Sequence, residues 1–180
     1  MFKLRRPFAL LLGTAAAAAL SLGFAQPSFA SAPPSPVTIY SNLSGLCVQP
    51  DPSNSGPDIQ LSQADCGNAT AQWRFWPLGN GNYHIQNVAT GNCMRALSDT
   101  DFAVVDTIDC TGISNENWSI QVDLSSVTPN LDEIRSHVAG GNRCLDVQQG
   151  SRASGAPIDI FHCTTNLSRN QFNWAQIFSI

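Results

Sequence analysis

The sequence predicts an all-β domain made of three similar four-strand units arranged about a pseudo-threefold axis. Three observations lead to this fold class. Six cysteines recur in evenly spaced pairs, apolar and polar residues alternate with a period of two, and a tryptophan segment ends each unit. Outside the N-terminal leader, no long stretch has the period of an amphipathic helix, so short β-strands are the expected elements.

The first 30 residues predict a secretory signal peptide. Three basic residues within "KLRR" form a positive n-region, an apolar run follows over residues 7–25, and small residues up to Ala30 favour cleavage there. The paired arginines also fit a twin-arginine export signal, whereas the apolar run is short for a membrane anchor. Residues 31–37 are rich in proline and serine and are expected to form a linker. We therefore expect a secreted or periplasmic/extracellular protein.

The predicted mature chain is acidic. Six arginines remain against 13 acidic residues, which gives a net charge of −7. This balance argues against nucleic acid and anionic membrane surfaces as partners, because both bind basic patches. Asparagine, glutamine, serine and glycine are abundant, a composition that suits turns and polar surfaces. No second apolar run of spanning length follows the leader, so we expect no transmembrane segment in the mature chain.

The six cysteines predict three disulfides, one within each unit. An even number of cysteines in an exported chain favours disulfides over metal. Neither a CxxC pair nor a His-x-x-x-His motif is present, so no metal and no cofactor are expected. The spacing within pairs is 19, 17 and 19 residues, and successive first cysteines lie 46 and 51 residues apart. Of the 15 possible pairings, the repeat selects Cys47–Cys66, Cys93–Cys110 and Cys144–Cys163.

Each unit repeats one order of segments, with boundaries at about residues 38–82, 83–131 and 132–180. A strand and a glycine turn precede the first cysteine, as in "IYSNLSGLC", "IQNVATGNC" and "HVAGGNRC". An apolar strand leads into the second cysteine, as in "IQLSQADC", "AVVDTIDC" and "PIDIFHC", and an aromatic segment follows. Because one unit cannot bury its apolar face alone, the three are expected to share a core. Its largest members would be Trp73, Trp118 and either Phe172 or Trp174.

These features resemble the ricin B-type lectin domain. The resemblance rests on three repeats, on the "CLDV" motif that starts at Cys144, and on an Asn-Gln pair with an aromatic residue after the last cysteine. It covers residues 38–180. It implies a β-trefoil fold and a secreted protein that binds carbohydrate.

The resemblance further implies one sugar site, located in the third repeat. In this family, an Asp two residues after the first cysteine accepts hydrogen bonds from vicinal hydroxyls. An aromatic residue two before the second cysteine stacks on the pyranose, and an Asn seven after it, followed by Gln, completes the contacts. Paired hydroxyls suit a carboxylate, and the C–H face of a sugar suits a ring. The matching residues and two neighbours are Asp146, Phe161, Asn170, Gln171, Asp159 and His162.

The first and second repeats lack this set. Gln49 and Ala64 stand at the Asp and aromatic positions of the first repeat, and Arg95 and Ile108 stand at those of the second. Both are expected to be structural repeats without a sugar site. Two acids of the second repeat are then expected to be solvated charges, namely Asp106 and Asp109.

No enzyme is expected, because the GxSxG and HExxH motifs and a glycine-rich phosphate loop are all missing. The alternative function is a β-trefoil that binds protein, as a protease inhibitor or a non-catalytic subunit of a toxin or complex. It would use the loops at residues 49–58 or 123–133. The two functions differ in whether Asp146 and Phe161 meet in one exposed pocket, as a lectin requires.

Overall fold

The computed structural model describes residues 33–54, 56, 58–122, 131–138, 140, 142–164 and 174–180. The predicted signal peptide lies outside these residues. Within these residues, none of the helices has the length and apolar character needed to span a membrane.

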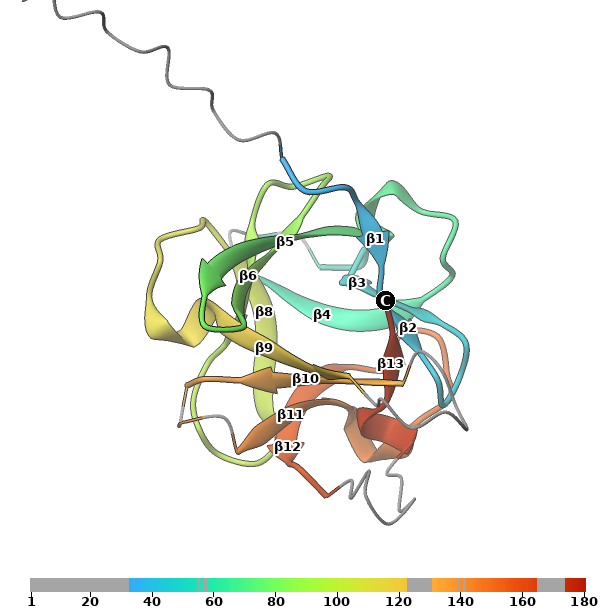
Figure 1. The fold of residues 1–180 in the computed structure, drawn as a ribbon. Coiled ribbons are helices and arrows are strands. Elements are labelled where there is room, and N and C mark those ends of the chain that lie inside the picture. Colours follow the sequence, from blue (N-terminus) through green and yellow to red (C-terminus); the bar gives the residue numbers. More distant parts are fainter. Residues whose placement is uncertain are drawn as a thin grey trace, which may run out of the picture. The chain divides into compact units, whose positions relative to one another are not determined.

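In this described part of the chain, short strands form three consecutive repeats of four (Figure 1). The first repeat contains β2 (Tyr40–Ser41), β3 (Cys47–Pro50), β4 (Ile59–Ala64) and β5 (Gln72–Gly79). The second contains β6 (Asn82–Asn87), β7 (Cys93–Ala96), β8 (Ala103–Ile108) and β9 (Asn117–Val122). The third contains β10 (Asp132–Ser136), β11 (Arg143–Val147), β12 (Ile158–His162) and β13 (Phe178–Ser179).

The second and third strands of each repeat form an antiparallel hairpin that a disulfide closes. In every hairpin, the first cysteine lies opposite the residue two positions before the second cysteine. The opposed pairs are Cys47 with Ala64, Cys93 with Ile108, and Cys144 with Phe161. The observed disulfides confirm the predicted pairing, namely Cys47–Cys66, Cys93–Cys110 and Cys144–Cys163.

The three repeats are joined by pairing between their strands. Of the hairpin strands, β8 pairs with both β4 and β12. Of the outer strands, β5 pairs with β6 and also with the short strand β1 (Val37–Thr38), while β9 pairs with β6 and β10. The last strand, β13, pairs with β10 and returns to β2 of the first repeat, beside which it lies in Figure 1. This closed threefold arrangement confirms the predicted β-trefoil.

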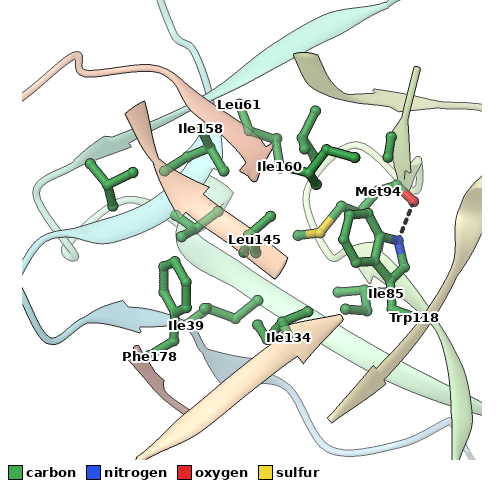
Figure 2. Packing of buried hydrophobic residues seen from close by; sticks show 14 of the residues in the cluster. Ile39, Leu61, Ile85, Met94, Trp118, Ile134, Leu145, Ile158, Ile160 and Phe178 are labelled. Carbon is green, nitrogen blue, oxygen red and sulfur yellow. Dashed lines mark hydrogen bonds between the residues drawn. The ribbon is translucent and has the colours of Figure 1, made fainter. Parts of the chain in front are cut away.

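The apolar face of every repeat contributes to one core. Side chains alternate along each strand, so Leu145 on β11 and Ile160 on β12 are fully buried in this core. Figure 2 shows the labelled core side chains converging from all three repeats: Ile39, Leu61, Ile85, Met94, Trp118, Ile134, Leu145, Ile158, Ile160 and Phe178. The same alternation turns Asp146 and Phe161 to the outer face of the β11–β12 hairpin.

Two buried tryptophans hold equivalent places in the first two repeats. Trp73 Nε1 donates a hydrogen bond to the Val48 carbonyl at 2.8 Å. Trp118 Nε1 donates one to the Met94 carbonyl at 2.9 Å, and Figure 2 shows this second bond. Each acceptor directly follows the first cysteine of its repeat. The indole therefore ties the end of the repeat to the start of its own hairpin.

The third repeat fills this place with phenylalanine. Trp73 and Trp118 each stand two residues after a 3-10 helix, which is η1 (Ala69–Ala71) or η2 (Ser114–Glu116). Two residues after the corresponding η5 (Trp174–Gln176) stands Phe178, which is fully buried. The place that the sequence assigned to Phe172 or Trp174 is thus held by Phe178, because the segment between the second cysteine and the 3-10 helix is longer in this repeat. Phe172 itself lies outside the described residues.

We expect Trp118→Phe to lower the free energy of unfolding by about 1–2 kcal/mol. The substitution leaves the buried Met94 carbonyl without its donor and opens a small cavity. Trp76→Phe is the matched control, since Trp76 is partly exposed and its Nε1 bonds the Gln86 side chain. Urea unfolding followed by circular dichroism measures both. Equal losses for the two variants would contradict the assigned role of Trp118.

Candidate functional site

A hollow of about 330 Å³ opens at the surface of the third repeat. Six residues from four segments line it: Phe102, Asp146, Gln149, Gly150, Phe161 and Ala175. The hairpin supplies Asp146 from β11 and Phe161 from β12, and Phe102 comes from the loop before β8 in the second repeat. Asp146 and Phe161, which the sequence paired as candidate site residues, therefore lie in one hollow.

The register of the hairpin places this carboxylate and this ring on one face. Asp146 lies opposite Asp159, and Cys144 lies opposite Phe161, so all four side chains share the outer face of β11 and β12. Asp146 and Phe161 are diagonal neighbours across the two strands. Residues in such a diagonal pair lie about 7–8 Å apart. The disulfide of Cys144 with Cys163 fixes the hairpin at the end next to the ring. The two groups are consequently held at a fixed separation before any ligand arrives.

The carboxyl group of Asp146, which lines the hollow, lies directly opposite a second buried carboxyl group, that of Asp159. Asp146 is 5% exposed and Asp159 is 1% exposed. Burial first, and then the charge of Asp159, raise the pKa of Asp146 from 3.8 to about 7, while a hydrogen bond from Gln176 opposes the rise. Burial also raises the pKa of Asp159 to about 6. Because like charges directly opposite each other repel, the two carboxyl groups titrate as a coupled pair near neutral pH.

Asp159 adjoins the hollow through Asp146 and does not line it. Neither of its oxygens has a hydrogen-bond partner within the described part of the chain. The side-chain amide of Gln148 lowers the pKa of Asp159, although it does not meet the geometry of a hydrogen bond, and the charge of Asp101 raises this pKa. Asp159 therefore acts on the hollow through the charge state of Asp146.

Three further residues were predicted for the site, namely His162, Asn170 and Gln171. His162 is exposed, and its Nδ1 lies 2.9 Å from Oδ2 of Asp101, so one ring nitrogen already has a partner. Asn170 and Gln171 lie outside the described residues, and their contacts with a ligand stay predictions.

Gln176, which the sequence did not indicate, is fully buried beside the hollow-lining Ala175. Its Oε1 accepts hydrogen bonds from the backbone N and Oγ1 of Thr164, just as Glu116 accepts them from Thr111 in the second repeat. Both threonines directly follow the second cysteine of their repeat. Gln176 thus matches Glu116 in place, and its neighbour Ala175 lines the hollow. The longer segment after Cys163 hid this correspondence.

Backbone strain gathers at the hollow. Among the described residues other than glycine, three have positive φ, and two of them line the hollow: Phe102 at 64° and Gln149 at 55°. The third, Asn80, lies in the β5–β6 turn, where asparagine tolerates this conformation. A left-handed conformation costs a residue with a side chain about 1–2 kcal/mol, and such strain clusters at functional sites. The glutamines after "CLDV" were a weak signal for Gln149, whereas nothing in the sequence pointed to Phe102.

The second repeat has a hollow of similar size, about 320 Å³, with different chemistry. Ile108 replaces the ring, and Arg95 replaces the acid. Arg95 lies opposite Asp106 and donates from Nε to Oδ1 at 2.9 Å. Asp106 is only 4% exposed, so the expectation that it is a solvated charge was wrong: the arginine compensates its burial.

The first repeat also lacks a free carboxylate at this position. Gln49 is fully buried and accepts a hydrogen bond from Thr70 Oγ1 at 2.8 Å. The residue opposite Cys47 is Ala64, which offers no ring. In the described part of the three hairpins, only the third combines a carboxylate with an aromatic ring at these two positions.

One group of side chains outside the hollow has potential metal ligands within 4.8 Å of one another, namely His84, Cys93 and Glu116. The Cys93 sulfur is bonded to Cys110. The Glu116 carboxylate accepts hydrogen bonds from Thr111 and Gly112. These atoms are committed to holding the second repeat together.

Comparisons with known proteins agree with this fold. The model of the ricin-type β-trefoil lectin domain-like family matches residues 28–101 and 69–161. No curated protein matches the chain. Among solved structures, the designed threefold symmetric protein ThreeFoil superposes with a TM-score of 0.69 at 20% identity, over 80% of this chain and 96% of that one. The Macrolepiota procera ricin B-like lectin in complex with lactose superposes with a TM-score of 0.62 at 12% identity, over 83% of this chain and 96% of that one.

A domain of an enzyme has the same fold. The exo-β-1,3-galactanase of Clostridium thermocellum gives a TM-score of 0.63 at 19% identity, and the match covers 79% of this chain but 29% of the galactanase. Structural matches at these identities establish the fold. The two family matches together span residues 28–161, which is well over half of the sequence. The chain belongs to the ricin-type β-trefoil lectin domain-like family.

Proposed function

We propose that this protein is a secreted lectin that binds glycans through one site in its third repeat. The observation that carries the proposal is the hollow in which the Asp146 carboxylate and the Phe161 ring lie together. Family membership and the lactose-bound Macrolepiota lectin support carbohydrate as the ligand class. Three disulfides suit an extracellular location.

Three residues that line the hollow have a defined part in this binding mode. The Phe161 ring stacks on the C–H face of a pyranose, while the ionised Asp146 accepts hydrogen bonds from two neighbouring hydroxyls. Gln149 offers a further donor and acceptor at the rim. Because the hairpin is stapled by a disulfide, little conformational entropy is lost on binding.

The arrangement of the carboxyl groups supports binding rather than hydrolysis. A glycosidase places two carboxyl groups on either side of the scissile bond. Here Asp146 and Asp159 stand side by side on one sheet face, and Asp159 is 1% exposed. The protein-binding alternative would be favoured by a buried Phe161, but this ring is partly exposed at the hollow.

A glycan array with the purified protein tests the proposal. The glycans should be densely displayed, because a single shallow site binds weakly and gains strength through multivalency. β-Galactosides are the first probes, given the lactose complex of the Macrolepiota lectin. Binding to a defined glycan supports a lectin, and no binding to any glycan would overturn it in favour of a protein-contact domain.

Phe161→Ala is expected to weaken binding to the array glycan about tenfold, because stacking of this kind contributes about 1 kcal/mol or more. Phe161→Tyr keeps the ring and should retain affinity. Titration calorimetry with the soluble glycan measures both variants. Unchanged affinity in Phe161→Ala would place the site elsewhere.

A further inference from the structure

We infer that the site extends to a second sugar unit, which Phe102 of the neighbouring repeat holds, so that the protein selects linear glycans over monosaccharides. The inference rests on the proposed function and goes beyond it. The ligand class that it names is a neutral glycan of at least two pyranose units. An acidic sugar would be repelled by the negative charge of the Asp146–Asp159 pair.

Phe102 continues the aromatic surface away from Asp146. Strand β12 lies between β11 and β8, so the path from Asp146 crosses Phe161 and reaches the loop that enters β8. The ring centroids of Phe102 and Phe161 are 4.9 Å apart and their planes are tilted by 47°. This is the separation of an aromatic pair in direct contact. The two rings therefore form one apolar surface that is longer than a single ring and can accept a second sugar of a linear glycan.

The Phe102 loop is fastened to the third repeat. The backbone N of Phe102 donates to the Ile160 carbonyl at 2.8 Å. Next to it, Asp101 accepts hydrogen bonds from the backbone N of His162 at 2.8 Å and from its Nδ1 at 2.9 Å. Arg143 Nε lies 3.1 Å from the same carboxylate. The ring is consequently positioned before a ligand arrives, which limits the entropy lost on binding.

Structural stability does not account for the exposed ring. Phe102 is 55% exposed, the highest value among the exposed large hydrophobic residues of the described chain. Its φ of 64° is a genuine outlier for a bulky residue. A strained, exposed phenylalanine contributes little to the core, and strain of this kind clusters at functional sites.

Phe102→Ala tests the inference against a panel that pairs each monosaccharide with its linear tetramer. The pairs are galactose with galactotetraose, xylose with xylotetraose, and N-acetylglucosamine with chitotetraose, extended by the glycan that the array selects. We expect the wild-type protein to bind one tetramer about tenfold or more tightly than its monomer, which exceeds the statistical factor of about four for a tetramer. Phe102→Ala should lose this advantage, because its affinity for the tetramer falls by a larger factor than its affinity for the monosaccharide.

Two further variants make the result specific. Phe102→Tyr retains a ring and should retain the preference for the tetramer. Leu78→Ala removes a side chain of similar exposure, 47%, on β5 away from the hollow and should change neither affinity. Equal affinity of the wild-type protein for tetramer and monomer would overturn the second subsite while the lectin function stands. An equal loss for both ligands in Phe102→Ala would also overturn it, and failure of all probes would overturn the proposed function itself.

Discussion

Asp146→Asn is expected to lower glycan affinity about 100-fold. In the proposed site, the ionised Asp146 accepts two hydrogen bonds from sugar hydroxyls, and hydrogen bonds to a charged group contribute about 1.5–3 kcal/mol each. An asparagine keeps one oxygen, and its amide group cannot accept the second bond. A loss of about 3 kcal/mol corresponds to a factor of about 100 in the dissociation constant.

Calorimetric titration of the array-selected glycan measures this effect. The substitution also removes a charge that Asp159 repels, so the unfolding temperature of the variant should not fall. The matched control is Arg95→Lys, because Arg95 has the equivalent strand position in the second repeat and lysine keeps a cation beside Asp106. Full binding by Asp146→Asn, or an equal loss in Arg95→Lys, would contradict a site in the third repeat.

Glycan affinity should rise with pH through about 7. Only the ionised Asp146 accepts both hydroxyl hydrogen bonds, and burial together with Asp159 raises the pKa of Asp146 to about 7. With a pKa near 7, the ionised fraction, and with it the affinity, is roughly tenfold lower at pH 6 than at pH 8. Titrations between pH 5.5 and about pH 8.5 follow the effect. A flat profile, or tighter binding in acid, would contradict it.

Asp159→Asn separates the causes of this pH dependence. The variant removes the neighbouring charge and should move the midpoint of the binding profile to lower pH. The movement should be partial, because burial of Asp146 is the larger cause and remains.

Stability should change in the opposite direction to binding. A carboxyl group whose folded pKa is raised stabilises the fold below its unfolded pKa and loses this contribution as pH rises through the folded pKa. The free energy of unfolding contributed by Asp146 and Asp159 should therefore decrease between about pH 4 and pH 7. Asp159→Asn should unfold at a higher temperature than the wild-type protein at pH 8.

The fold was predictable because its signals repeat. Each pair of cysteines, with an apolar strand before the second, marks one hairpin, and the same register recurs three times. The disulfide pairing followed from that repetition alone. The places of Asp146 and Phe161 on the hairpin followed from the same repetition, since each stands two residues from a cysteine, whereas their part in sugar binding was implied by the family resemblance and stays a prediction.

The parts that sequence reasoning missed depend on contacts between repeats or on changed segment lengths. Phe102 belongs to the second repeat, and its ring contacts Phe161 only because β8 pairs with β12. Phe178 and Gln176 were hidden by the longer segment after Cys163, which shifts the spacing seen in the other repeats. Burial of Asp106 depends on the facing arginine, a partner that no local pattern reveals.

A crystal structure of the protein with its array-selected glycan tests the central claim most directly. We predict one sugar ring stacked on Phe161, with two neighbouring hydroxyls on Asp146 and the next unit over Phe102. A glycan bound instead in the second-repeat hollow beside Arg95, with the third-repeat hollow free of sugar, would contradict the proposed site.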